Sequence, residues 1–297
     1  KNINDLSLLK LQGTIKHLVV VGCYPSRFKK TDLSNKFPHV DLWLTTQEQS
    51  QLKHHLSQLV FSKKFMPKKE TPYIKLTPSH YAYLKISEGC NNWCSFCTIP
   101  KIRGQHQSKS IDDIYKEAEH QIRFGVKELI LIAEDTTAWG EDIYGKPSFP
   151  ILLKKLADLP VKWIRPMYIF PSRVTDDFIQ VMKDTPSITP YIDIPIQHCN
   201  TELLASMKRN HDKPFLEALL KRFYTEIPNI ALRTSFILGY PGETEAHVEE
   251  LLSFITDYPF AHIGCFAYSD EHGTRSARLD NKVPQDVIQD RIQRVMD

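Results

Sequence analysis

The sequence has 297 residues, of which 41% are hydrophobic and 25% charged, and its formal net charge is +3. This composition is typical of a soluble globular protein with room for one large or two ordinary domains, and the mild charge favours neither a nucleic-acid nor a membrane partner. No apolar run approaches the roughly 20 residues that cross a bilayer, and six cysteines are too few for a disulfide scaffold.

Residues 1–62 are predicted to form part of a small domain. The pattern predicts a helix over Asp5–Leu11, a strand over Lys16–Val21, a helix after it, a short strand over Val40–Leu44 and a polar helix over Gln47–Val60. This alternation of strands and helices is typical of doubly wound α/β domains. Residues 63–80 are expected to be a linker, because the stretch from Ser62 to Pro78 holds three prolines and five lysines with little periodicity.

Residues 81–277 are predicted to alternate six strands with helices, which makes the fold class α/β. The predicted strands are Ala82–Ser87, Glu128–Ala133, Trp163–Ile169, Tyr191–Ile194, Ile230–Leu238 and Ile263–Tyr268, and the helices are Ile111–Phe124, Ile151–Leu159, Asp176–Lys183, Thr201–Met207, Pro214–Ile227 and Glu243–Thr256. Six parallel strands joined by helical crossovers fit an open or partial barrel. In such folds the chemistry gathers at the carboxyl ends of the strands. Residues 278–297, which end in a helical pattern, are expected to lead into a further segment.

Three cysteines follow the first strand of this larger region, with the spacing Cys90-x3-Cys94-x2-Cys97. Thiolates favour iron–sulfur clusters, zinc or Cu(I). A structural zinc site needs four protein ligands, so three cysteines in one loop indicate a cluster that keeps one iron open. The alternative is a zinc site completed by His80 or His106, both outside the usual spacings. Clustered cysteines without a secretory signal indicate a reducing compartment, so we expect a cytoplasmic protein.

The run from Ile86 to Pro100, with Phe96 directly before the last cysteine, resembles the radical SAM enzymes. These enzymes use S-adenosylmethionine (SAM) and a 4Fe–4S cluster. The same run, closed by Arg103-Gly104, is similar to their methylthiotransferase branch, which inserts sulfur into a C–H bond and methylates it. The resemblance implies a partial (βα)6 radical SAM barrel preceded by part of a small doubly wound α/β domain. It also implies that the start of that small domain, and a C-terminal RNA-binding-type (TRAM) domain, lie outside this sequence.

The resemblance further implies which residues hold the cofactors. Cys90, Cys94 and Cys97 would hold the catalytic cluster, and the SAM-binding residues would be Phe96, Glu134, Asp135, Thr136, Asp193, Gln197, Arg233, Gly239 and Glu243. The structural alternatives are an ordinary polar turn at Glu134–Thr136 and a tight glycine turn at Gly239. Cys23 would otherwise be a buried thiol, but it matches the third ligand of an auxiliary 4Fe–4S cluster whose other ligands lie outside this sequence.

The loop Asp135–Gly140 and the run from Tyr191 to His198 resemble one branch of the methylthiotransferases. That branch adds a methylthio group to the β-carbon of an aspartate on small-subunit ribosomal protein twelve. The implied partners are that protein or the ribosome, and an electron donor such as flavodoxin or ferredoxin, with no membrane. Two alternatives remain open. One is a tRNA adenosine methylthiotransferase, whose loop is typically rich in Asn, and the other is a non-catalytic iron–sulfur or zinc binding module.

Overall fold

The computed structural model describes residues 2–61 and 77–297, which divide into two compact units. The first unit contains residues 2–61 together with Ile99–Gly104, and the second contains the remaining described residues. The predicted linker at 63–80 falls almost wholly outside the described residues. Among residues 2–61 and 77–297, no helix has both the length and the apolar character that crossing a bilayer requires.

The first unit is a short parallel sheet with helices. Strands β1 (Val19–Gly22) and β2 (Leu42–Thr45) pair in parallel, with Val19 opposite Leu42. The helices are α1 (Asn2–Leu11), α2 (Cys23–Arg27), α3 (Lys30–Lys36), α4 (Leu52–Phe61) and α5 (Ile99–Arg103), with a 3-10 turn at Gln49–Gln51. A small core of Leu18, Leu33, Val40 and Trp43 closes it. The predicted β–α–β order is therefore found, with parallel strands joined by helices as expected.

The second unit is built on six parallel strands. They are β3 (Tyr81–Lys85), β6 (Glu128–Ile132), β7 (Trp163–Pro166), β8 (Tyr191–Asp193), β9 (Ala231–Leu238) and β10 (His262–Ala267). They pair in the order β3-β6-β7 and β8-β9-β10, and a parallel bridge from Ile164 to Ile188 continues β7 toward β8. The strands thus follow one another in sequence order around an open barrel, which confirms the predicted α/β fold class.

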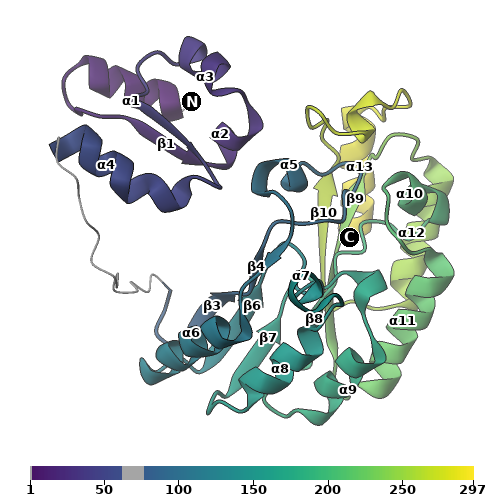
Figure 1. Cartoon of the computed structure of the whole chain (residues 1–297). Coiled ribbons are helices and arrows are strands. Elements are labelled where there is room, and N and C mark those ends of the chain that lie inside the picture. Colours follow the sequence, from purple (N-terminus) through teal and green to yellow (C-terminus); the bar gives the residue numbers. More distant parts are fainter. Residues whose placement is uncertain (1, 62–76) are drawn as a thin grey trace. The chain divides into compact units, whose positions relative to one another are not determined.

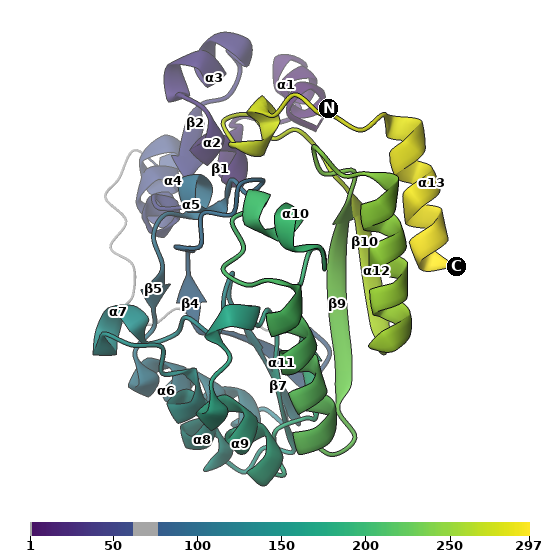
Figure 2. The same ribbon diagram turned by 90° about the vertical axis from the view of Figure 1, so that its right-hand side faces the viewer.

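The helices of this unit follow the strands, and the longer ones lie on the outer side of the curved sheet (Figures 1 and 2). They are α6 (Ile111–Arg123), α7 (Glu141–Tyr144), α8 (Phe149–Ala157), α9 (Asp176–Asp184), α10 (Thr201–Ser206), α11 (Lys213–Glu226), α12 (Glu245–Asp257) and α13 (Gln285–Met296). Several begin where a polar side chain caps the first turn: the Ser110 hydroxyl accepts from the Asp113 N–H, and Thr175, Asn200, Asp212 and Thr244 act in the same way. Such caps satisfy N–H groups that the helix leaves open.

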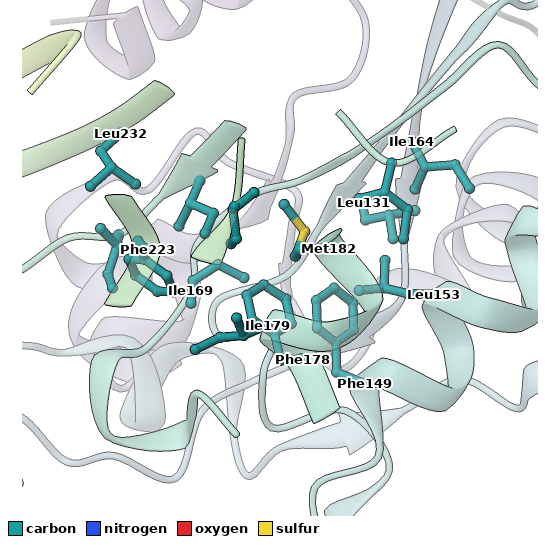
Figure 3. Close-up of a cluster of buried hydrophobic side chains, with 14 of the residues drawn as sticks. Leu131, Phe149, Leu153, Ile164, Ile169, Phe178, Ile179, Met182, Phe223 and Leu232 are labelled. Carbon is teal, nitrogen blue, oxygen red and sulfur yellow. The ribbon is translucent and has the colours of Figure 1, made fainter. Parts of the chain in front are cut away.

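The hydrophobic core fills the space between these helices and the outer face of the strands. Leu131, Ile164 and Leu232 come from the sheet and pack with Phe149 and Phe178 of the helices (Figure 3). Along β9, buried residues alternate with partly exposed ones. Because successive side chains of a strand point to opposite faces, the other face of β9 is free to line a site.

One element was not predicted. The sequence suggested a single strand over Ala82–Ser87, but β3 ends at Lys85, and β4 (Ser87–Glu88) instead pairs antiparallel with β5 (Gln107–Ser108). Ile86 bridges the two pairings, because its N–H donates to Ile132 and its carbonyl accepts from Lys109. This short hairpin closes the base of the segment that carries the three cysteines.

Candidate functional site

Other elements of the second unit hold the middle of the cysteine loop in place. The Ser95 N–H donates to the Met207 carbonyl (3.0 Å), and the Ser95 carbonyl accepts from the Ser276 N–H (3.0 Å). The Ser95 hydroxyl lies 2.8 Å from the Tyr240 hydroxyl, and both groups are buried. Three segments far apart in sequence therefore fix one residue between Cys94 and Cys97.

A buried carboxylate holds the first half of the loop. Asp135, at the end of β6, accepts from the Asn92 side chain (2.8 Å), and it also accepts from the Thr137 hydroxyl (2.5 Å). The guanidinium of Arg173 lies 3.3 Å from the same carboxylate. Asp135 is predicted to bind SAM, and its oxygens also accept hydrogen bonds from the protein. Its visible role is to tie the cysteine loop to the ends of β6 and β7.

The donor set of the loop fits an iron–sulfur cluster. Cys90, Cys94 and Cys97 are free thiols and all three are partly exposed. Burial, followed by the negative charges of Asp135, Cys94 and Cys97, raises the pKa of Cys90 to about 11. Bound iron would compensate the negative charge of the three thiolates.

In the part of the chain that the structure describes, the arrangement of the side chains bears equally on the iron–sulfur cluster and on the zinc alternative. No group of three Cys, His, Asp or Glu side chains there is arranged to hold a metal ion. The ring of His106 is buried and lies 3.2 Å from the Ser108 hydroxyl of β5. The sequence prediction of a cluster on three cysteines therefore rests on the kind of ligand they offer, and the loop would have to gather its sulfurs on binding.

A pocket of about 460 Å³ opens along one face of β9, between the carboxyl ends of β8 and β10. It brings together four of the predicted SAM-binding residues, Phe96, Asp193, Gln197 and Arg233, with Tyr168, Ser235, Phe266 and Tyr268 among the other lining residues. Phe96 belongs to the cysteine loop, so the pocket and the loop share a wall. A cation, an amide, hydroxyls and aromatic rings can together bind a ligand that carries both an anionic group and a planar ring.

Arg233 is oriented by its neighbour on the adjacent strand. Asp193 of β8 lies opposite Arg233 of β9, and its carboxylate accepts from the guanidinium at 3.1 Å. The other oxygen of Asp193 accepts from the Tyr168 N–H (3.2 Å). Asp193 is 1% exposed, and its burial raises the pKa of the carboxyl against the lowering effect of these bonds. Arg233 therefore lines the pocket with a guanidinium whose position is fixed by its hydrogen bond to Asp193.

Three non-glycine residues of the same pocket and loop have a strained, left-handed backbone conformation. Trp93, Tyr168 and Gln197 have φ values of +50°, +59° and +78° although none is glycine. Each such conformation costs on the order of 1–3 kcal/mol and persists where the surroundings enforce it, often at functional sites. Trp93 lies in the cysteine loop, and the other two line the pocket.

The remaining predicted SAM contacts after β6 are not among the lining residues of this pocket. Thr136 is fully buried, and its hydroxyl donates to the Met167 carbonyl at 2.6 Å. Glu134 lies beside it at the end of the strand and is partly exposed. A contact between SAM and Glu134, Asp135 or Thr136 stays a prediction.

Gly239 and Glu243 belong to a turn that contacts helix α13. The Glu243 carboxylate accepts from the Gly239 N–H (2.9 Å) and from Arg291 of α13 (2.8 Å). A Cβ on Gly239 would lie 2.3 Å from the side chain of Ile288, so α13 requires glycine here. Burial raises the pKa of Glu243. The Glu243 side chain is turned toward α13 and away from solvent, and the SAM contact predicted for these two residues is likewise untested.

The other cysteines occupy different surroundings. Cys23 is exposed at the start of α2, after Gly22 with φ +111°, so the alternative that it is a buried thiol is wrong. Cys199 is buried. Cys265 packs against the core from β10, where burial raises the pKa of its thiol to about 11. Of these three, Cys23 alone is open to a further ligand set.

Sequence reasoning missed three residues of the site. Tyr168 carries the strained backbone at the end of β7, Arg173 braces Asp135, and Arg209 lies with a guanidinium nitrogen 3.5 Å from the Cys94 sulfur. No local pattern marks them, because each is a single residue in an ordinary loop. Their role depends on contacts with segments distant in the chain.

Comparison with known proteins shows which family this chain resembles. The model of the radical SAM superfamily matches residues 84–255. The chain is 42% identical over 301 residues to the ribosomal protein uS12 methylthiotransferase RimO of Myxococcus xanthus, covering 99% of this chain and 63% of that protein. It is 38% identical to the protein of the same name from Desulforamulus reducens, covering 100% of this chain and 69% of that protein. Against the first of these relatives, the chain thus spans a little less than two thirds of the length.

A solved structure shows the same fold at low identity. The cobalamin-dependent S-adenosylmethionine radical enzyme OxsB, with aqua-cobalamin and S-adenosylmethionine bound, superposes with a TM-score of 0.60 at 13% identity. The match covers 87% of this chain and 41% of that one. At this identity the likeness concerns the fold alone.

Proposed function

This chain belongs to the radical SAM superfamily and, within it, to the family of the RimO uS12 methylthiotransferases, and from that premise we propose the activity of the whole protein. It adds a methylthio group to the β-carbon of an aspartate on ribosomal protein uS12. The observation that carries the proposal is a three-cysteine loop whose Phe96 forms a wall of the Arg233 pocket.

The two cofactors of this reaction have separate places in the second unit. Cys90, Cys94 and Cys97 hold a 4Fe–4S cluster, which when bound supplies the electron and the open iron needed to split SAM into a radical. Arg233, fixed by Asp193, pairs with the SAM carboxylate. Gln197 hydrogen-bonds the ribose, and the aromatic rings of the pocket exclude water from it.

The proposal also includes a second cluster, which one residue of the first unit helps to bind. Cys23 is one thiol ligand of an auxiliary 4Fe–4S cluster, and its exposure leaves it open to ligands from elsewhere in the whole protein. A small electron-transfer protein such as flavodoxin or ferredoxin supplies the electron. Both requirements are met in the reducing cytoplasm, where we place the protein.

Anaerobic reconstitution tests the cofactor part of the proposal. About four irons per chain, with SAM converted to 5′-deoxyadenosine under a reductant, is the expected result for one cluster of this type. A single bound zinc and no cleavage of SAM would instead identify a binding module. This measurement needs no ribosomal substrate.

The substrate is tested in cells that lack the full-length protein. Mass spectrometry of uS12 and of total tRNA nucleosides compares the methylthio group on each. Loss of the modified aspartate with methylthioadenosine retained is expected. Loss of the nucleoside with uS12 unchanged would assign the protein to the tRNA branch.

A further inference from the structure

We propose that Arg209 is a positioning residue of the cluster site, whose buried positive charge faces the Cys94 sulfur and makes the bound cluster easier to reduce. The inference rests on the proposed cluster on Cys90, Cys94 and Cys97. It adds a residue that the cysteine motif does not contain. Arg209 follows helix α10, more than a hundred residues after the loop.

Three constraints hold the Arg209 side chain in one place. One guanidinium nitrogen donates to the Pro195 carbonyl (2.7 Å), and the guanidinium carbon lies 4.0 Å from the centre of the Phe170 ring. The preceding residue, Lys208, has φ +57°, which turns the chain sharply after α10. The remaining terminal nitrogen lies 3.5 Å from Cys94 Sγ. A planar guanidinium fixed in this way directs one donor at the sulfur.

The charge of Arg209 lacks an ordinary partner. The residue is 8% exposed, and in the part of the chain that the structure describes no carboxylate lies within ion-pair distance of it. Its Nε is buried without a hydrogen-bond acceptor. Removing one charge from water costs several kcal/mol unless an opposite charge compensates. Among the groups that Arg209 contacts, Cys94 is the one that becomes negative when it binds iron.

The other neighbours of Arg209 do not supply that charge. His211 is buried, and burial followed by the positive charge of Arg209 lowers its pKa to about 3, so it is neutral at pH 7. Phe170 and the Pro195 carbonyl contribute only partial negative charge. The positive charge of Arg209 therefore has no negative partner among these neighbours, and a negatively charged cluster on Cys94 would supply one.

A fixed cation beside a cluster ligand has a defined electrical effect. Reduction adds one negative charge to the cluster, and a nearby positive charge stabilises the reduced form more than the oxidised form. Charge and hydrogen bonds at the sulfurs are among the main determinants of cluster potentials. Because Pro195 also lines the pocket, the same arginine ties the cluster loop to the pocket wall.

The test compares Arg209→Met with Arg209→Lys in the reconstituted 297-residue chain. Iron per chain is measured first, and the reduced cluster is then followed by electron paramagnetic resonance during a potentiometric titration. We expect Arg209→Met to lower the reduced-to-oxidised ratio about tenfold at a given potential, which is about 59 mV for a one-electron couple. Arg209→Lys, which keeps the charge, should recover most of that ratio. The matched control is Arg222→Met, which removes an exposed arginine paired with Asp176 and Glu226.

The outcomes separate this inference from the proposed function. If the wild-type chain binds no iron–sulfur cluster, the proposed function fails and this inference falls with it. If the wild type is loaded and Arg209→Met keeps the wild-type midpoint, the inference alone is overturned. Loss of iron in both Arg209→Met and Arg209→Lys, with folding intact by circular dichroism, also overturns it, since the charge would then be irrelevant. Loss of iron in Arg209→Met alone supports it.

Discussion

The two places where a thiol of this chain is proposed to bind iron differ in what surrounds them. Around Cys94, the loop is fixed by Met207, Tyr240 and Ser276, and an arginine faces the sulfur. Around Cys23, a single exposed thiol begins a five-residue helix. A ligand set needs its scaffold as much as its donor atoms. The proposed cluster on the loop therefore has a scaffold within this chain, whereas the proposed ligand Cys23 has none of these supporting contacts.

The largest expected effect is at the loop. Cys94→Ala removes one of three ligands and should abolish both iron binding and conversion of SAM to 5′-deoxyadenosine in the reconstituted chain. Two thiols cannot fill the positions that the cluster offers to protein ligands. The control is Cys265→Ala, which alters a partly buried thiol in β10 and should leave both measurements nearly intact. Equal losses in the two variants would mean that the loop has no special role.

The next effect concerns the pocket beside the loop. Arg233→Met should weaken SAM binding by about 10- to 100-fold, because a charge-assisted hydrogen bond contributes roughly 1.5–3 kcal/mol. Iron content should not change, since Arg233 contacts Asp193 and none of the cysteines. Equilibrium dialysis with SAM on the loaded chain gives the dissociation constant. Unchanged affinity would show that this pocket is not the SAM site, leaving the cluster assignment intact.

The scaffold of the second unit also contains a buried neutral histidine. Burial, followed by the charge of His247, lowers the pKa of His198 to about 3. The unfolded chain has an ordinary pKa near 6.5, so it binds an extra proton below that pH, and the stability due to neutral His198 is lost as pH falls from about 6.5 toward 3. The expected loss is about 1.4 kcal/mol per pH unit for this one group. Urea unfolding at pH 7.0 and 5.5 measures it.

His198→Gln is the matching variant for that measurement. It should show a drop in unfolding free energy smaller than that of the wild type by about 1.3 kcal/mol over the same interval, because most of the proton uptake begins below pH 6.5. His211, whose pKa is also lowered to about 3 by burial, continues to contribute in both proteins. A drop of the same size in wild type and variant would mean that His198 is protonated in the folded chain.

A further effect on stability is expected from the hydrogen bonds of the Tyr240 hydroxyl, which help to fix Ser95 in the cysteine loop. Tyr240→Phe removes a hydroxyl that bonds to Ser95 and donates to the Ser206 carbonyl (3.0 Å). Leaving buried groups without this partner should lower the free energy of unfolding by about 1–3 kcal/mol. Tyr83→Phe on the 47%-exposed ring of β3 serves as the control and should cost less than 0.5 kcal/mol, roughly the value for surface changes. Reconstituted Tyr240→Phe should also lose iron faster to a chelator than the control.

The sequence predicted those parts of the molecule that local patterns encode. The six strands of the barrel and the helix that begins at Ile111 follow from periodicity, and the structure has them within a few residues. The cysteine spacing and four of the pocket residues were also readable, since they lie at strand ends or within a known motif. The contacts of Glu243 could not be predicted, because whether its side chain faces a ligand or α13 depends on Arg291, 48 residues later.

The same limit explains why Arg209 was missed. Its neighbours in the chain, Lys208 and Asn210, suggest a solvated helix end. Its burial depends on Phe170 and Pro195 from two other strand ends. Contacts that join distant segments leave no periodic trace in the sequence. Prediction from the sequence therefore finds the ligands of a site more readily than the residues that support them.

The smallest expected effect is at Cys23. It tests most directly the comparison between Cys23 and the cysteine loop. Cys23→Ala in this chain should leave iron content at about four per chain and SAM cleavage at the wild-type level, because one exposed thiol cannot hold a cluster by itself. In the full-length protein the same change should lower iron content and stop methylthiolation of uS12, while cleavage of SAM continues. If Cys23→Ala reduces the iron bound by the 297-residue chain as strongly as Cys94→Ala, the contrast between the two sites is wrong, and Cys23 belongs to the same cluster as the loop.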